Sequence, residues 1–559
     1  MPNYIVAVIG RYCDHALTVR LQAKEVICRG SMQGVSTCLY QSYSTNVQGG
    51  KEMKRCSSRL SLVCFSLVVL FSGIGNAADK SISTDVVVVG AGSAGLSAAV
   101  SAAYAGAKVI VLEKMPFAGG SSNFAEGLFA VKTDQQRRKA IGLTKEEAYW
   151  HAMDYHHYRN NAGLLAQTVA NSTSIIEWLE KQGVGFEVVT MSPTEAPTWH
   201  LIKDWGTAHH GAALVQAMQA KAKELGVKIY FETPAKELIY NGGAVAGVKA
   251  VNAKGDHYTI NAKAVVIATG GFNNSKEMVR KWTRFDADKV FPTVPINKTG
   301  DGINMALAAG ADSEGWGLML HPGTHGEGIK PLGPLYAMTW QPLLWVNKYG
   351  DRVVDENAVW AFTFAGNAIE RQRDGFVWSI WDDETVRYME EHGIDNGLGV
   401  LVPIGTKLTD LRAEIATAVA QKSSSIVVGD SIEELAQKMG VEPARLKENV
   451  DQYNHAKETG RDEKFYRKAD TIVPVKTGKL YALKVFPYNF VSIGGVKTDL
   501  KMEVTDKNDK AIPGLYAAGA DVGGLYGDTY ATWTSGMMFQ WAAQSGKIAG
   551  EQAAAYGKR

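Results

Sequence analysis

Cysteine is absent from most of this 559-residue chain, because all five cysteines lie between Cys13 and Cys64. Their absence further on excludes a disulfide framework, a CxxC zinc site and a CxxCH haem attachment there. We therefore expect no metal site, haem or iron–sulfur centre in the chain. An excess of one charge is also missing: 59 basic and 57 acidic residues leave a net charge of +2, which indicates no nucleic-acid partner.

Long hydrophobic runs are scarce as well. Residues 60–71 form an apolar stretch that follows two basic residues and precedes the small residues 75–78, which is the pattern of a secretory signal peptide. The stretch is shorter than the ~20 residues that a membrane span requires. We expect residues 53–78 to be a signal peptide and residues 1–52 to be a non-native or unstructured extension. The mature chain would then be periplasmic or secreted, with no stable membrane span.

Glycine, in contrast, is plentiful, with 58 residues, and it opens the mature chain in a regular pattern. A β-branched run at residues 84–89 is followed by Gly90, Gly92 and Gly95, an alanine-rich helix, and a second strand that ends at Glu113. Such glycines permit a tight turn, a close approach of pyrophosphate to the backbone, and close helix–strand packing, while the acid binds ribose hydroxyls. The helix N-terminus offers N–H groups to the phosphates. This order of elements predicts an α/β dinucleotide-binding domain.

Three further segments favour FAD over NAD. Residues 114–122 add a glycine–serine loop, residues 264–271 read as a buried strand that ends in Thr-Gly-Gly, and residues 512–521 read as a strand leading into a glycine turn and an acid. Together with the first motif, these segments resemble the fumarate reductase/succinate dehydrogenase flavoprotein family, which includes 3-ketosteroid dehydrogenases and urocanate reductase. The resemblance implies an α/β fold: a glutathione-reductase-like FAD-binding Rossmann domain with an inserted α+β substrate-capping domain.

The resemblance also implies which residues hold the FAD. In chain order they are Gly90, Gly92, Gly95, Glu113, Lys114, Gly120, Ser121, Ala235, Thr269, Gly270, Asp301, Gly519, Asp521 and Gly536, the last at the start of a helix that faces the flavin. Family members with covalent flavin carry a histidine just after the glycine–serine loop, and residues 122–126 contain none. We therefore expect non-covalent FAD. The FAD domain would comprise residues 84–318 and 478–559, and the cap residues 319–477.

The substrate end of the chain departs from the family's fumarate reductases, which clamp a dicarboxylate with arginines. Guanidinium groups suit that task because they bind carboxylates in a bidentate manner. Here Trp360 stands where one of these arginines would, and no arginine occurs between Arg467 and Arg559. The family's histidine ahead of a Gly-Gly turn is also missing from residues 489–495. The chain therefore does not match a typical fumarate reductase.

The segment around Tyr530, which stands in place of the arginine clamp, resembles the corresponding segment of the 3-ketosteroid dehydrogenases. Tyr530 matches their tyrosine, whose hydroxyl binds a ketone oxygen together with a backbone N–H, and such donors stabilise an enolate. Trp360 occupies the position of their tyrosine base, where an indole cannot act as an acid or base. An aromatic substrate that stacks on Trp360 and Trp533 fits at least as well as a steroid. His321 is a candidate for substrate contact or proton transfer, and a purely structural histidine is the alternative.

These observations predict an FAD-dependent oxidoreductase that acts on CH–CH groups, moving a hydride between flavin N5 and a bond conjugated to a carbonyl. We expect it to reduce an unsaturated aromatic or enone-type acceptor with electrons from a separate cytochrome c or quinol-linked donor. A 3-oxosteroid-type dehydrogenase is one alternative, and an electron-transfer flavoprotein without a small organic substrate is another. The aromatic–imidazole run at residues 155–158 is interpreted as packing, because adjacent positions lie on different faces of a helix.

Overall fold

The computed structural model describes residues 78–190, 196–476 and 478–558, which lie in one compact unit. The expectations for residues 1–77, an extension followed by a signal peptide, therefore fall outside the described residues. Within the described ranges, no helix is long and apolar enough to cross a membrane.

The FAD-binding half is built on a sheet whose central strands run parallel. Its order is β18-β19-β9-β1-β2-β6, with β7 and β8 attached beyond β9. The strands are β1 (Asp79–Val89), β2 (Val109–Leu112), β6 (Lys228–Tyr230), β7 (Ala235–Asn241), β8 (Ala244–Val251), β9 (His257–Ile267), β18 (Glu503–Thr505) and β19 (Ala511–Ala517). Val86, Val87 and Val88 of β1 are fully buried, as expected for a parallel strand covered on both faces. The C-terminal strands thus complete a sheet that begins at Asp79.

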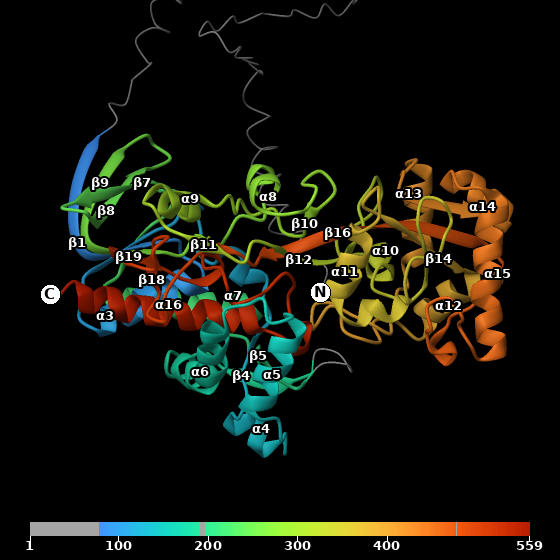
Figure 1. Cartoon of the computed structure of the whole chain (residues 1–559), viewed down its shortest axis with the longest axis horizontal. Helices are drawn as coiled ribbons and strands as arrows, with labels where there is room; N and C mark the ends of the chain where they lie inside the picture. Colours follow the sequence, from blue (N-terminus) through green and yellow to red (C-terminus); the bar gives the residue numbers. More distant parts are fainter. Residues whose placement is uncertain (1–77, 191–195, 477, 559) are drawn as a thin grey trace, which may run out of the picture. The chain divides into compact units, whose positions relative to one another are not determined.

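Helices α3 (Ser93–Tyr104) and α16 (Met537–Tyr556) lie side by side against this sheet (Figure 1). Two glycines of α16 explain the close approach. A side chain at Gly546 would overlap the carbonyl group of Ala94, and one at Gly550 would overlap that of Ala98. The last helix of the chain is therefore fitted to the first helix of the dinucleotide motif.

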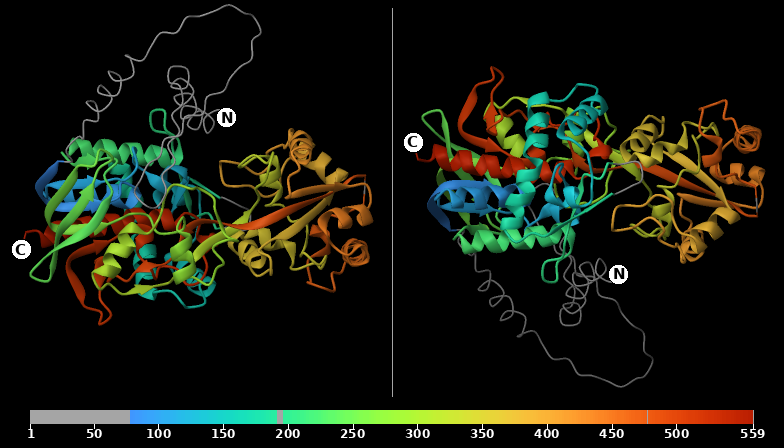
Figure 2. Two further views of the ribbon diagram at one scale, coloured as in Figure 1. Left: turned by 90° about the horizontal axis from the view of Figure 1, so that it is seen from above. Right: turned by 90° about the horizontal axis from the view of Figure 1, so that it is seen from below.

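A second sheet is organised around β16 (Leu480–Ser492), which is 13 residues long. Its first half pairs with β14 (Val377–Asp382) and β15 (Ile426–Gly429), its second half pairs with β10 (Phe291–Pro292) and β12 (Leu318–Gly323), and β13 (Leu344–Val346) flanks β14. Figure 2 shows β16 as a long strand in both views. The sequence-based boundary at residue 478 therefore separates the cap from a strand that is hydrogen-bonded into its sheet.

The cap has its own apolar core. Trp340, Trp345 and Trp381 are fully buried there and stabilise the cap. The covering helices are α10 (Pro334–Met338), α11 (Phe362–Glu370), α12 (Asp383–Glu391), α13 (Leu411–Ala420), α14 (Ile432–Met439) and α15 (Pro443–Thr459).

A smaller region lies between β2 and β6. Its described residues contain the three-stranded sheet β3-β5-β4, one 3-10 helix and four α-helices. The elements are the 3-10 helix η1 (Gly120–Phe124), β3 (Gly127–Phe129), α4 (Asp134–Arg138), α5 (Lys145–Tyr155), α6 (Ala162–Lys181), β4 (Phe186–Val189), β5 (Trp199–Ile202) and α7 (His210–Glu224). Helices α8 (Lys276–Trp282) and α9 (Asp301–Ala308) and strands β11 (Ser313–Glu314) and β17 (Gly495–Val496) complete the FAD-binding half.

Candidate active site

The first glycine motif forms the turn between β1 and α3. Gly90 has a φ of +107°, and a side chain there would overlap the carbonyl of Ala268. A side chain at Gly95 would overlap the carbonyl of Gly90. Helix α3 has no side-chain cap after Gly92 and no acidic residue in its first turn. The turn therefore holds a helix N-terminus in a position to bind an anionic phosphate group.

Three predicted residues lie together beside this turn. Glu113 accepts hydrogen bonds from the N–H groups of Ala91 and Met115, both at 2.8 Å, and burial raises the pKa of its carboxyl. Lys114 Nζ forms an ion pair with Asp301 Oδ2 at 2.8 Å, at the start of α9. Backbone N–H groups thus fix Glu113 after β2. Its neighbour Lys114 joins α9 to the first glycine motif.

Asp521 holds the turn that follows β9. Its carboxylate accepts hydrogen bonds from the Thr269 N–H, from Thr269 Oγ1 at 2.9 Å and from the Gly271 N–H at 2.8 Å, and burial raises its pKa. Two residues earlier, Gly519 donates its N–H to Ser545 Oγ of α16 at 2.9 Å. Asp521 therefore shapes the Thr-Gly-Gly turn itself, a role that the sequence motif did not reveal.

The residues along this path fit a dinucleotide. A Cβ atom at Gly120 would meet nothing within 4 Å, and one at Gly270 would meet nothing closer than 3.8 Å. The hydroxyl of Ser121 is buried without a hydrogen-bond partner among the described residues. Ala235, at the start of β7, is also buried. Open space beside two glycines and an unused hydroxyl donor are the features that a bound pyrophosphate would require.

Tyr530 lies at the N-terminus of α16, where Gly536 precedes the helix with a φ of +83°. The N–H of Met538 is 3.5 Å from Tyr530 Oη. The ring of Tyr526 stacks on that of Tyr530, with centroids 4.8 Å apart, and both rings are buried. Burial and the neighbouring Tyr530 raise the pKa of Tyr526 well above its usual range. A phenol beside helix N–H groups can stabilise negative charge on a substrate oxygen.

Helix α5 joins this tyrosine to the cap through Tyr155, which belongs to the run interpreted above as packing. Tyr155 Oη is 2.7 Å from Thr363 Oγ1 of α11, and Thr363 Oγ1 donates to the carbonyl of Tyr530 at 3.0 Å. The ring of Tyr155 also stacks on Phe364, with centroids 4.8 Å apart. Three segments that are distant in sequence therefore meet at Tyr530.

Aromatic rings continue along the same helix. His151, one turn before Tyr155, stacks on Trp533, with centroids 3.8 Å apart and ring planes 10° apart. The indole that we expect to stack on a substrate thus has an imidazole on one of its faces. Trp360 ends the 3-10 helix η2 (Glu356–Trp360), directly before α11. A search for aromatic residues at i and i+4 on α5 would have identified His151 and Tyr155.

His321 is fully buried in β12. Its Nε2 lies 2.6 Å from Thr293 Oγ1, its Nδ1 lies 2.9 Å from the carbonyl oxygen of Pro322, and its ring stacks on Phe490. Burial lowers the pKa of His321 to about 3. A neutral imidazole with partners at both nitrogens favours the structural interpretation of this histidine over proton transfer.

Two arginines of the cap, Arg352 and Arg467, are buried. Arg352 bonds Glu356 in a bidentate manner, with both distances 2.8 Å, and Asp462 at 2.8 Å. Arg467 bonds the same Glu356 at 2.9 Å. Both guanidinium groups are engaged by carboxylates of the protein, so neither is placed to clamp the carboxylate of a substrate.

A carboxyl group links the flavin side to the cap. Glu126 lies between η1 and β3, and its Oε1 accepts the N–H groups of Val400 at 3.1 Å and Leu401 at 2.7 Å. A side chain at Gly399 would overlap Glu126 Oε2. Burial raises the pKa of Glu126 to about 8. The cap loop is therefore tied down by an acid that keeps its proton through most of the neutral range.

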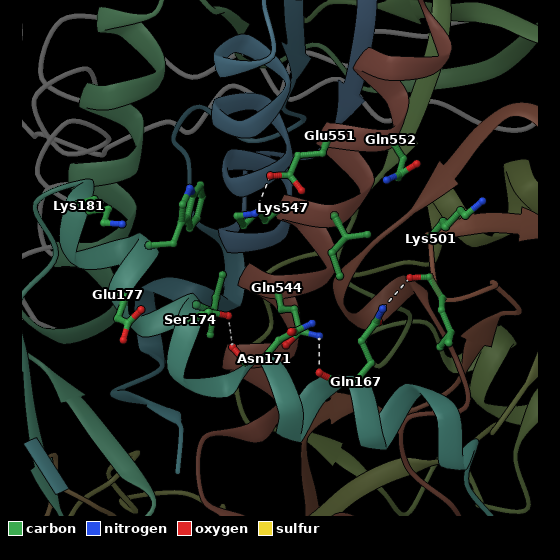
Figure 3. Close-up of a pocket in the computed structure, with 14 residues that line it drawn as sticks. Gln167, Asn171, Ser174, Glu177, Lys181, Lys501, Gln544, Lys547, Glu551 and Gln552 are labelled. Carbon is green, nitrogen blue, oxygen red and sulfur yellow. Dashed lines mark hydrogen bonds and ion pairs between the residues drawn. The ribbon is translucent and has the colours of Figure 1, made fainter. Parts of the chain in front are cut away.

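A separate polar groove of about 580 Å³ lies between α6, α16 and residues 500–501 (Figure 3). Its lining includes the Lys547–Glu551 ion pair at 2.6 Å. None of the site residues predicted from the sequence is among the described residues that line it. The groove is thus distinct from the region around Tyr530.

The fold and the dinucleotide turn define an FAD-dependent oxidoreductase that acts on CH–CH groups. A family model, the FAD binding domain, matches residues 85–534, and the chain belongs to this family. Vinyl phenol reductase of Lactiplantibacillus plantarum is 37% identical over 483 residues, covering 85% of this chain and 97% of that protein. The predicted family, fold class and FAD cofactor are thereby confirmed.

Two solved structures show the same fold. The open conformation of a flavocytochrome c3 fumarate reductase aligns with a TM-score of 0.66 and 27% identity, over 91% of this chain and 83% of that one. A 3-ketosteroid-Δ4-(5α)-dehydrogenase from Rhodococcus jostii RHA1 aligns with a TM-score of 0.67 and 23% identity, over 86% of this chain and 99% of that one.

Proposed function

We propose that this chain reduces the carbon–carbon double bond of a small substrate whose oxygen is conjugated with that bond through an aromatic ring, as in vinyl phenols. The observation that carries the proposal is Tyr530, a phenol at a helix N-terminus whose ring stacks on that of Tyr526, in a segment without arginine from residue 468 to 558. The similarity to vinyl phenol reductase supports the same substrate class.

The chemistry follows from conjugation. When bound, the reduced flavin supplies a hydride. A vinyl phenol that shifts its phenolic proton to the terminal vinyl carbon becomes a conjugated carbonyl compound, which accepts hydride at the adjacent carbon and leaves negative charge on the oxygen. Tyr530 Oη would donate a hydrogen bond to that oxygen, and the Met538 N–H, which donates to Tyr530 Oη at 3.5 Å, would help to stabilise the charge. The contacts of Tyr155 and Thr363 would hold Tyr530 in place beneath the cap.

The test mixes anaerobically reduced holoenzyme with 4-vinylphenol, cinnamate-type acids, urocanate, an enone steroid and fumarate, and follows the return of the oxidised flavin spectrum. We expect vinyl phenols to be fastest and Tyr530→Phe to slow reoxidation by roughly 10²-fold, the usual effect of losing one such donor. Tyr466→Phe, at an exposed tyrosine, is the matched control. Fastest reoxidation by fumarate, or an unaffected Tyr530→Phe variant, would contradict the proposal.

We further propose that the chain works outside the cytoplasm with a separate electron donor. The signal-like pattern at residues 53–78 and the lack of a haem attachment motif support this. N-terminal sequencing of the protein from its native host should find a start near Ala78, whereas a start at Met1 would contradict export. A reduced c-type cytochrome should reduce the bound flavin anaerobically.

A further inference from the structure

Reduction of a double bond consumes one proton with each hydride. The residues described above include no source of that proton. Tyr530 is only 6% exposed. The indole of Trp360 is not an acid or base at neutral pH, and both nitrogens of His321 are engaged. A route for protons to Tyr530 must therefore involve other groups.

Buried polar atoms without partners gather where residues 156–161 meet residues 524–530. His156, at the C-terminal end of α5, is fully buried, and neither of its ring nitrogens has a hydrogen-bond partner among the described residues. Asn160 Oδ1 and Asp528 Oδ1 likewise lack hydrogen-bond partners in the described ranges. Buried polar atoms in folded proteins normally bond ordered water when no protein group is available. This interface, which we call the His156 seam, is therefore a site for ordered water.

The inner end of the His156 seam reaches the candidate catalytic tyrosine. The rings of His156 and Tyr526 pack edge to face, with centroids 5.3 Å apart and planes at 86°. Tyr526 in turn stacks on Tyr530. A Cβ atom at Gly527 would lie 2.8 Å from the carbonyl oxygen of His156, so the glycine lets the two segments approach closely.

The outer end of the His156 seam reaches solvent at Asp528, whose side chain is 35% exposed. Arg159 Nη1 lies 3.3 Å from Asp528 Oδ2, and His157 Nδ1 lies 3.9 Å from Asp528 Oδ1. His157 and Tyr158 have φ values of +51° and +55°, a backbone conformation that is costly for residues other than glycine. With this backbone conformation, His156 is buried while His157, the next residue, is exposed.

We propose that His156 and Tyr526, together with ordered water in the His156 seam, form a relay that carries protons from Asp528 to Tyr530. The inference rests on the proposed function. In each turnover the O–H bond of Tyr530 breaks and an O–H bond forms on the substrate oxygen. The relay then returns a proton from solvent to Tyr530. His156 accepts a proton at one nitrogen and releases one from the other, which leaves its charge unchanged and exchanges its tautomer. Rotation of the ring then restores the starting tautomer before the next turnover.

The electrostatic surroundings of His156 suit this task. Burial lowers the pKa of His156 to about 4, so the imidazole is neutral at pH 7 and offers one donor and one acceptor. The charged and titratable groups that face it are Asp528, which favours its protonation, and His157, which opposes it, with Tyr526 on the inner side.

The experiment compares a first turnover with steady-state turnover. Tyr530 carries one proton at the start, so His156→Phe and Tyr526→Phe should reoxidise reduced flavin at close to the wild-type rate in a single turnover. Steady-state turnover should fall roughly 10²-fold, as expected for loss of a proton-transfer group, with a larger solvent isotope effect in D₂O. His257→Gln, at an exposed histidine, is the matched control.

Each other result of this experiment leads to a different conclusion. Unchanged steady-state turnover would overturn the relay, and an equal loss in single and multiple turnovers would show that His156 is only structural. If wild-type reduced enzyme is reoxidised by no conjugated substrate, the proposed function fails instead. Independently of activity, a high-resolution crystal structure should show ordered water within hydrogen-bond distance of both His156 nitrogens, and a dry seam would overturn the relay.

Discussion

The two sides of the proposed active site are built in different ways. On the FAD side, the predicted positions are set by the backbone: Gly90 and Gly95 leave room for the turn, and backbone N–H groups fix Glu113. On the substrate side, side chains from α5, α11 and the segment before α16 meet around Tyr530. Backbone-defined sites leave a regular spacing in the sequence, whereas sites assembled from distant side chains do not.

The largest effect should come from the FAD side. Gly95→Ala places a methyl group against the carbonyl of Gly90, so the turn and α3 must move apart. We expect a loss of about 3 kcal/mol in the free energy of unfolding, the upper end of overpacking costs, together with loss of bound FAD. Denaturant unfolding and flavin fluorescence measure both. Gly142→Ala, where no atom lies within 4 Å, is the control. Equal unfolding free energies and equal FAD binding in the two variants would contradict a backbone-defined FAD side.

An effect that depends on pH should appear where the two sides meet, at Glu126. Its pKa rises from 4.5 in the unfolded chain to about 8 in the fold, so the folded state retains a proton that the unfolded state releases. The stability due to Glu126 is thus complete below pH 4.5 and declines as the pH rises to about 8, by at most about 1.4 kcal/mol per pH unit.

Glu126→Gln removes that titration while keeping an acceptor for the cap loop. Relative to wild type, the variant should therefore be more stable at pH 8.5 than at pH 5.5. Unfolding free energies of both proteins at the two pH values test this, because other titrating groups cancel in the difference. A constant difference would show that Glu126 does not titrate in the fold as described.

The smallest effect should come from the substrate side. Tyr155→Phe removes one hydrogen bond to Thr363, worth about 1 kcal/mol. Because Thr363 still bonds the Tyr530 carbonyl, we expect steady-state kcat/KM to fall roughly fivefold, with FAD binding unchanged. Tyr104→Phe, which removes a hydrogen bond to Gln182 on the FAD side, is the control. A loss of FAD from Tyr155→Phe would contradict the separation of the two sides.

The sequence predicts the FAD side well because strand, turn and helix are contiguous there. A β-branched run followed by Gly90, Gly92 and Gly95 suffices to predict strand β1, the turn and helix α3. It does not predict that Asp521 holds the turn after Thr269, because that contact joins residues some 250 positions apart. Local sequence patterns do not predict packing between distant segments.

The same reason explains why the contacts on the substrate side could not be predicted. Tyr155 and His156 belong to a run that resembles surface packing until the fold brings residues 526–534 against it. Glu126 is one acid among many until its contact with the cap loop is known. The boundary at residue 478 follows from the positions of the FAD motifs, and it lies just before the half of β16 that pairs with β14 and β15 of the cap.

Strand β16 has a mechanical consequence. Residues 480–485 are bonded to β14 in the cap, and from Phe486 onward the same strand is bonded to β12, which leads back to the FAD-binding half. A cap on loose linkers would drift between open and closed positions. Here, opening must flex a continuous strand near Val485 and Phe486, so each excursion meets an elastic restoring force. The stiffness of one β-strand would then govern how often substrate and product exchange.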